Sequence, residues 1–257
     1  MRRQALHEAL WQAGTGREQE VVLRCGDRSL TYECFFQGIL QAEAGLRALG
    51  VEAGDLVSLF SLNTPEAVMA FYAIDRIGAV ANWVDMKVSP VEVEDYLTQA
   101  NSKVALVLEV AFPKVYRHRG NAPTEHFVVL PLAPYLSPAL GEKLRLNTWQ
   151  TQGGAGCLAW EDFLRPPTGQ APETRRWEEA AAITYTGGTT GPAKGVVLSR
   201  RSFAWSLDHY ARADTEYGRG GSALVLLPLF AVFGLSQCLH TPLSLGMGVI
   251  LCPLFRP

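Results

Sequence analysis

Short apolar segments alternate with helical patterns along the first half of the chain, and this alternation limits the fold more than any other feature. Apolar runs of strand length occupy residues 56–61, 80–84 and 104–108. Between the first two runs, Thr64 can cap a helix that has Pro65 in its first position and ends at Gly78. Residues 89–92 form a second helix start, a capping box with proline in the first position. Strand–helix–strand alternation is typical of a parallel sheet covered by helices, so we expect an α/β fold.

Other segments indicate how the chain is divided. Residues 21–31 have the pattern of a β-hairpin, and Thr31 can cap a helix that runs to about residue 49. Residues 131–156 show no clear period and are expected to be rich in loops. Residues 166–173 are rich in Pro and Gly, as linkers often are. We therefore predict a first α/β subdomain at 1–165, a linker at 166–178 and the start of a second α/β subdomain at 179–257.

Residues 185–197, YTGGTTGPAKGVV, are the segment with the clearest chemical meaning. The segment holds the glycines Gly187, Gly188 and Gly191, the threonines Thr186, Thr189 and Thr190, and the lysine Lys194. Glycines let backbone N–H groups converge on one anion, while hydroxyl and ammonium groups add donors. The spacing is not that of a Walker A loop, and the residues after the loop predict a strand rather than a helix. We interpret the segment as a strand–loop–strand that cradles a polyphosphate; the alternative is a glycine-rich surface hairpin without a ligand.

The composition limits the class of protein. The chain has 257 residues, of which 48% are hydrophobic and 19% charged, and its net charge is −2. This balance gives no reason to expect nucleic acid or an anionic membrane surface as a partner. The five cysteines lack CxxC spacing and are expected to be reduced thiols in the cytoplasm. His7 and Glu8 interrupt any apolar leader, so we expect no signal peptide.

Residues 220–255 contain no Asp, Glu, Lys or Arg, which makes a membrane span an alternative for this segment. Prolines and polar side chains interrupt the run, so we expect a strand, a helix and a second strand instead. Both strands are apolar throughout, as in a parallel sheet that is covered on both faces. His240 is expected to be a hydrogen-bonded histidine, buried or at an interface, rather than a catalyst, because no acidic residue is near it in the sequence.

Residues 185–197 resemble the phosphate-binding motif of the AMP-forming acyl- and aryl-CoA synthetases, the adenylate-forming superfamily. The resemblance extends to the segments NTPE at 63–66, AIDRIGAV at 73–80, SPVEVE at 89–94 and LPLFAVFG at 227–234. It covers nearly the whole chain and is weakest at residues 111–176. It implies parallel sheets flanked by helices, as the incomplete N-terminal domain of such an enzyme.

The resemblance also implies roles for individual residues. The loop from Thr186 to Lys194 would wrap the β- and γ-phosphates of ATP, and Thr189 would help to hold Mg²⁺. The acyl pocket would be lined by Phe230, Ala231, Phe233 and Gly234. CoA is the acyl acceptor in the family. The sequence departs from the family pattern in two places. Ala231 stands where family members commonly have histidine. Residues 192–193 read Pro-Ala, whereas the family usually has Gly-x-Pro-Lys, with the proline directly before the lysine.

No complete catalytic set is expected in these 257 residues. The family's Mg²⁺-binding glutamate, ribose-binding aspartate, hinge and catalytic lysine lie in segments without a counterpart here. The chain is therefore interpreted as the N-terminal part of an ATP-dependent acyl-CoA ligase for a fatty acid, weak or inactive by itself. The alternatives are a non-catalytic nucleotide- or acyl-binding protein and one half of a split ligase. Residues 223–255 are expected to self-associate or to need a partner chain.

Overall fold

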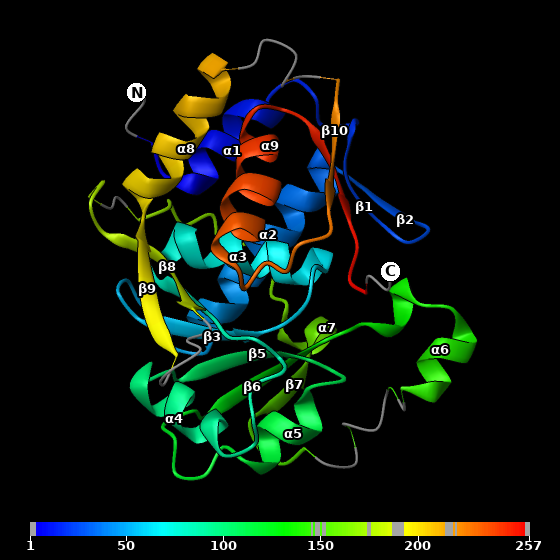
Figure 1. Cartoon of the computed structure of the whole chain (residues 1–257), viewed down its shortest axis with the longest axis vertical. Helices are drawn as coiled ribbons and strands as arrows, with labels where there is room; N and C mark the ends of the chain where they lie inside the picture. Colours follow the sequence, from blue (N-terminus) through cyan, green and yellow to red (C-terminus); the bar gives the residue numbers. More distant parts are fainter. Residues whose placement is uncertain are drawn as a thin grey trace.

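The computed structural model describes residues 4–144, 146, 150, 153–173, 176–186, 193–213, 218 and 220–254. In this part of the chain the strands form two sheets, and helices α2 (Tyr32–Ala48) and α3 (Pro65–Ile77) lie between them (Figure 1). The predicted α/β fold with mostly parallel sheets flanked by helices is confirmed.

The larger sheet has seven strands. Its order is β7 (Cys157–Ala159), β6 (His126–Leu130), β5 (Val104–Leu108), β3 (Leu56–Phe60), β4 (Val80–Trp83), β8 (Ala180–Thr186) and β9 (Lys194–Ser199). All neighbours are parallel except β8 and β9, which are antiparallel. The smaller sheet has the order β10 (Ser222–Val225), β11 (Gly248–Leu251), β1 (Val21–Cys25) and β2 (Arg28–Thr31). Its antiparallel pair, β1 and β2, is the predicted hairpin.

The remaining helices pack around these sheets. They are α1 (Leu6–Gly14), α4 (Glu92–Gln99), α5 (Phe112–Arg117), α6 (Pro138–Lys143), α7 (Trp160–Phe163), α8 (Arg200–Ala213), α9 (Thr241–Ser244), the 3-10 turn Ala133–Tyr135 and a π-helical segment, Gly234–His240. Helices α1 and α5 and strand β7 were not predicted. The predicted loop-rich segment 131–156 contains α6 and the 3-10 turn.

The strands β3, β4, β5 and β6 of the larger sheet are buried on both faces. In β5, Leu106 and Leu108 belong to the core shared with α2 and α3, while Ala105 and Val107 belong to a second core under α4 and α5. A strand that is covered on both sides gains from apolar residues at every position. This explains why β3, β5 and β6 appear in the sequence as continuous apolar runs.

The predicted helix signals agree with the structure at two of three sites. Thr31 and Thr64 cap α2 and α3 with their side chains, and Gly78 ends α3 at a φ of 79°. The third helix, α4, begins at Glu92 and not directly after Ser89. The Ser89 hydroxyl donates to the Glu92 carboxylate at 2.5 Å, so the two side chains of the expected capping box do meet. The hydroxyl bonds that side chain instead of a backbone N–H, and a turn precedes the helix.

The late uncharged segment forms a strand, a helical region and a strand, as expected. No helix in the described part of the chain is long and apolar enough to cross a membrane. The expectation that both strands are covered on both faces is wrong, because side chains on one face of each strand are exposed. Leu224 on β10 is 56% exposed and Ile250 on β11 is 37% exposed. Their strands are apolar on both faces, although one face is open to solvent among the described residues.

The two predicted sequence subdomains share both sheets. Strands β8 and β9 follow the segment 166–178 and join the sheet formed by β3–β7. Strands β10 and β11 join β1 and β2 in the smaller sheet. Each sheet therefore takes strands from both sides of the proposed linker.

Candidate functional site

The β8–β9 hairpin carries the glycine-rich segment at its tip. The two strands pair in antiparallel register from Ala180 opposite Ser199 to Thr186 opposite Lys194. Thr186 and Lys194 are exposed, and the Thr186 hydroxyl lies 3.5 Å from the Lys194 carbonyl oxygen. The predicted strand–loop–strand arrangement is therefore present, and it places a hydroxyl and an ammonium group at the two ends of the loop.

The other predicted phosphate-binding residues, Gly187, Gly188, Thr189, Thr190 and Gly191, lie outside the described residues. Their roles, including the role of Thr189 as a Mg²⁺ ligand, stay predictions. In the described part of the chain, no group of three or more His, Cys, Asp or Glu side chains could hold a metal ion.

A chain of side-chain hydrogen bonds crosses the sheet below this hairpin. The Tyr185 hydroxyl donates to Asn82 Oδ1 at 2.9 Å, and Asn82 Nδ2 donates to Ser58 Oγ at 3.0 Å. The ring of Tyr96, on α4, meets that of Tyr185 edge-on with centroids 4.6 Å apart. Burial raises the pKa of Tyr185, so its hydroxyl stays a neutral donor. These contacts fix the end of β8 from which the glycine-rich loop starts.

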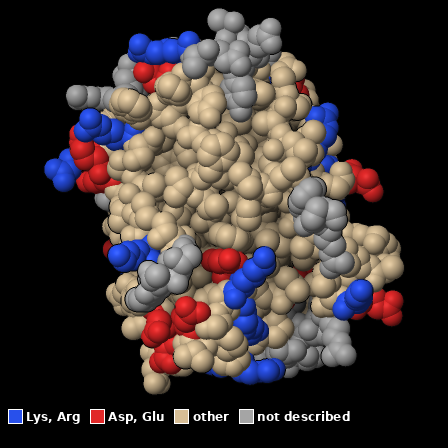
Figure 2. Space-filling model, viewed as in Figure 1, with Lys and Arg blue, Asp and Glu red and all other residues tan. Residues whose placement is uncertain are grey.

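The predicted acyl-pocket residues lie on the segment that leads into the π-helical region. The side chain of Phe233 is 55% exposed, Phe230 and Ala231 are half-buried, and Gly234 is buried. A Cβ at Gly234 would lie 2.2 Å from the carbonyl oxygen of Pro228, so the close turn there requires glycine. Figure 2 shows a broad uncharged area in the middle of this face, consistent with the absence of charged residues from 220 to 255.

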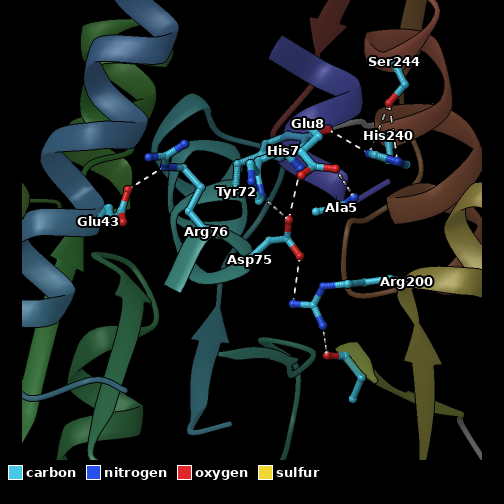
Figure 3. Close-up of polar contacts among 11 residues, drawn as sticks. Ala5, His7, Glu8, Glu43, Tyr72, Asp75, Arg76, Arg200, His240 and Ser244 are labelled. Carbon is cyan, nitrogen blue, oxygen red and sulfur yellow. Dashed lines mark hydrogen bonds and ion pairs between the residues drawn. The ribbon is translucent and has the colours of Figure 1, made fainter. Parts of the chain in front are cut away.

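A buried ionic cluster lies between α1, α3 and α8 (Figure 3). Asp75 is 1% exposed, and its Oδ2 lies 2.7 Å from His7 Nδ1. Its Oδ1 lies 2.9 Å from the Arg200 guanidinium, which is also buried. Burial by itself would raise the pKa of Asp75, but the hydrogen bond from His7 and the charge of Arg200 lower it below its usual value. Asp75 is therefore ionised and ties three helices together.

Sequence reasoning did not find this cluster. The only signal is that Asp75 lies near the end of a helix, 65–77, whose residues are mostly apolar. Its partners are 68 and 125 positions away along the chain, so no local pattern connects them.

His240 is the buried, hydrogen-bonded histidine that the sequence predicted. Its Nδ1 lies 3.1 Å from the Tyr72 hydroxyl, and the Ser244 hydroxyl is 3.4 Å away. Burial lowers the pKa of His240 to about 4, so the imidazole is neutral at physiological pH. The five cysteines are all free thiols.

Comparison with known proteins supports the family resemblance. Residues 10–257 match the family described as AMP-binding enzyme. The long-chain-fatty-acid–CoA ligase of Bacillus subtilis is 24% identical over 242 residues, which is 90% of this chain and 43% of that protein. The long-chain-fatty-acid–CoA ligase of Thermus thermophilus is 33% identical over 206 residues, 79% of this chain and 34% of that protein.

A solved structure shows the same fold. The anthranilate CoA ligase AuaEII, in complex with anthranoyl-AMP, matches with a TM-score of 0.81 and 23% identity, over 99% of this chain and 47% of that one. The chain thus spans less than half the length of these relatives. Because the family match extends over almost all of its residues, the chain belongs to the AMP-binding enzyme family, the adenylate-forming CoA ligases, and corresponds to their N-terminal part.

Proposed function

We propose that these residues form the triphosphate- and acyl-binding part of an ATP-dependent, AMP-forming acyl-CoA ligase. The observation that carries the proposal is the β8–β9 hairpin, which brings exposed Thr186 and Lys194 together at the ends of the glycine-rich loop. A compact ammonium group beside converging backbone donors suits a triphosphate. Thr189 would contribute a hydroxyl ligand to Mg²⁺, and CoA would accept the acyl group.

The proposed substrate is a fatty acid. Two relatives are named long-chain-fatty-acid–CoA ligases, and every side chain in the segment 227–234 is apolar. The half-buried Phe230 and the small Ala231 would border the acyl chain. The anthranilate ligase makes an aryl acid the competing choice.

The polypeptide of residues 1–257 alone is proposed to be a weak or inactive ligase, because it matches less than half of the relatives. Fatty-acid-dependent exchange of pyrophosphate into ATP tests this directly. We expect a rate far below an ordinary enzyme turnover of about 1–10³ s⁻¹. Exchange in that range by this polypeptide would contradict the proposal.

The second candidate is one half of a split ligase, and the open face of the smaller sheet favours it. Leu224, Leu227 and Phe233 are each between 46% and 56% exposed, near the free edge of β10. Contiguous apolar patches and open strand edges are typical of surfaces that another polypeptide covers. Light scattering during size-exclusion chromatography should show self-association, which a polypeptide supplying the remainder of the fold should suppress. A monodisperse monomer at high concentration would argue against this candidate.

A further inference from the structure

The side chain of Asn63 holds the beginning of the segment 227–234, which carries the predicted acyl-pocket residues. Asn63 is 2% exposed and lies between β3 and α3, directly before the residue that caps α3. Its Oδ1 accepts from the backbone N–H of Leu229 at 3.1 Å. Its Nδ2 donates to three backbone carbonyl oxygens, those of Val225 and Leu227 at 3.1 Å and that of Cys252 at 3.3 Å. Both ends of the carboxamide are therefore in use.

These hydrogen bonds connect the two sheets at the ends of their strands. Val225 is the last residue of β10 and Cys252 directly follows β11, whereas Asn63 follows β3 of the larger sheet. Leu227 and Leu229 lie beyond the end of β10, where the strand ladder no longer supplies partners for backbone groups. The Asn63 side chain supplies those partners, at the point where the chain leaves the smaller sheet and enters the segment 227–234.

The anchored residues lie on either side of Pro228, on which the acyl-pocket turn is built. The Pro228 carbonyl oxygen accepts from the backbone N–H of Ala231 at 3.0 Å, and the Ala231 carbonyl oxygen accepts from that of Leu235 at 3.0 Å. A Cβ at Gly234 would lie 2.2 Å from the same Pro228 oxygen. Because closely packed groups leave little room for independent movement, a shift of Pro228 would also displace Ala231 and Gly234.

We propose that Asn63 is a positioning residue of the acyl pocket. It acts through the backbone of residues 227–229 and sets where Phe230 and Ala231 border the acyl chain. This inference rests on the proposed acyl-binding function of the segment. An apolar acyl chain is recognised mainly by the shape of its pocket, so a displaced wall weakens binding. A carboxamide is required, because a carboxylate of the same shape would keep the bond from Leu229 but could not donate to the three carbonyl oxygens.

The first measurement compares Asn63→Ala with Ser102→Ala in the 257-residue chain. Ser102 is a matched control, because it is also buried and precedes β5, at the opposite end of the parallel strands from Asn63. Its Oγ likewise serves several backbone groups, accepting from the N–H of Ser58 at 2.9 Å and lying 3.0 and 2.8 Å from the carbonyl oxygens of Leu56 and Val104. In hydrogen exchange followed by mass spectrometry, Asn63→Ala should raise the exchange rates in residues 229–235 at least about ten-fold more than Ser102→Ala does.

Calorimetric titration with dodecanoate and with Mg·ATP gives the functional readout. Asn63→Ala should weaken dodecanoate binding by at least about five-fold and change Mg·ATP binding by less than about two-fold. The reason for this difference is that the four hydrogen-bond partners of Asn63 all lie outside β8 and β9. A loss of folded protein would weaken both ligands alike, so the difference between them separates positioning from general destabilisation.

Asn63→Asp is the second variant, and it keeps the test decisive where Asn63→Ala does not fold. A protonated carboxyl group can donate to one carbonyl oxygen, whereas a carboxylate cannot. The exchange protection of residues 229–235 in Asn63→Asp should therefore be greater at pH 5 than at pH 8, with no such difference in Ser102→Ala.

The inference is overturned if the Asn63 variants change exchange in residues 229–235 no more than Ser102→Ala does. It is also overturned if the wild-type chain binds dodecanoate and Asn63→Ala binds it equally well; the proposed acyl function then stands. A wild-type chain that does not bind dodecanoate contradicts the proposed acyl function itself, and the acyl role of Asn63 with it.

Discussion

Glu66→Gln should remove a specific pH dependence from the stability of the protein. The folded-state pKa of Glu66 is raised from 4.5 to about 7, chiefly by burial. Each pKa unit corresponds to about 1.4 kcal/mol, so the difference corresponds to roughly 3 kcal/mol. The folded state holds the proton more tightly than the unfolded state. This stabilisation is therefore complete below pH 4.5 and is lost as the pH rises to about 7 and above.

Glutamine keeps the shape of the side chain and does not titrate in this range. The difference in unfolding free energy, variant minus wild type, should therefore rise by about 3 kcal/mol between pH 4.5 and pH 8. Urea denaturation followed by circular dichroism at several pH values measures this difference, and other titrating groups cancel in it. A difference that stays constant within about 0.5 kcal/mol would refute the argument that the buried Glu66 carboxyl is poorly compensated.

Three further substitutions test other parts of the structure. Asp75→Asn should destabilise the protein by about 3–5 kcal/mol at pH 7, because it leaves the buried Arg200 without its counter-charge. The pKa of Asp75 is lowered in the folded state, so its contribution to stability should be complete above the usual pKa near 3.8. The contribution should disappear as the pH falls through the lowered, folded-state pKa. Asn82→Ala should cost about 1–3 kcal/mol in urea denaturation, because the Tyr185 hydroxyl loses its acceptor, and a neutral result would mean that the hydrogen-bond chain under the hairpin contributes nothing. Leu224→Lys should reduce self-association in light scattering without lowering the thermal midpoint, since this side chain is 56% exposed, and unchanged association would remove β10 from the contact surface.

The parts of this fold that could be predicted are those that a local sequence pattern specifies. Helix α3 was located by Thr64, Pro65 and Gly78, and all three occupy the expected positions. The strands β8 and β9 were predicted from apolar runs on either side of a glycine-rich loop, and the structure pairs them antiparallel. Strand β7 was missed because it has three residues, all of intermediate burial, and its pairing with β6 is set by tertiary contacts.

The parts that the sequence did not reveal depend on contacts between distant residues. The pairing of β11 with β1 joins segments more than 220 positions apart, and nothing local indicates it. The Asp75 cluster likewise gathers side chains from three separate helices. A charged residue in an apolar helix signals a buried partner, but it does not say which residue that partner is.

The account rests most directly on whether the hairpin holds a triphosphate. Calorimetric titration of the chain with Mg·ATP and with AMP, repeated on Lys194→Ala, measures this. We expect ATP to bind more tightly than AMP. The substitution should weaken ATP binding by about ten-fold and change AMP binding by less than about two-fold, because in the proposed complex the exposed Lys194 would contact the phosphates that AMP lacks. Equal affinities for the two nucleotides, or an ATP affinity that Lys194→Ala leaves unchanged, would contradict the proposed role of the loop.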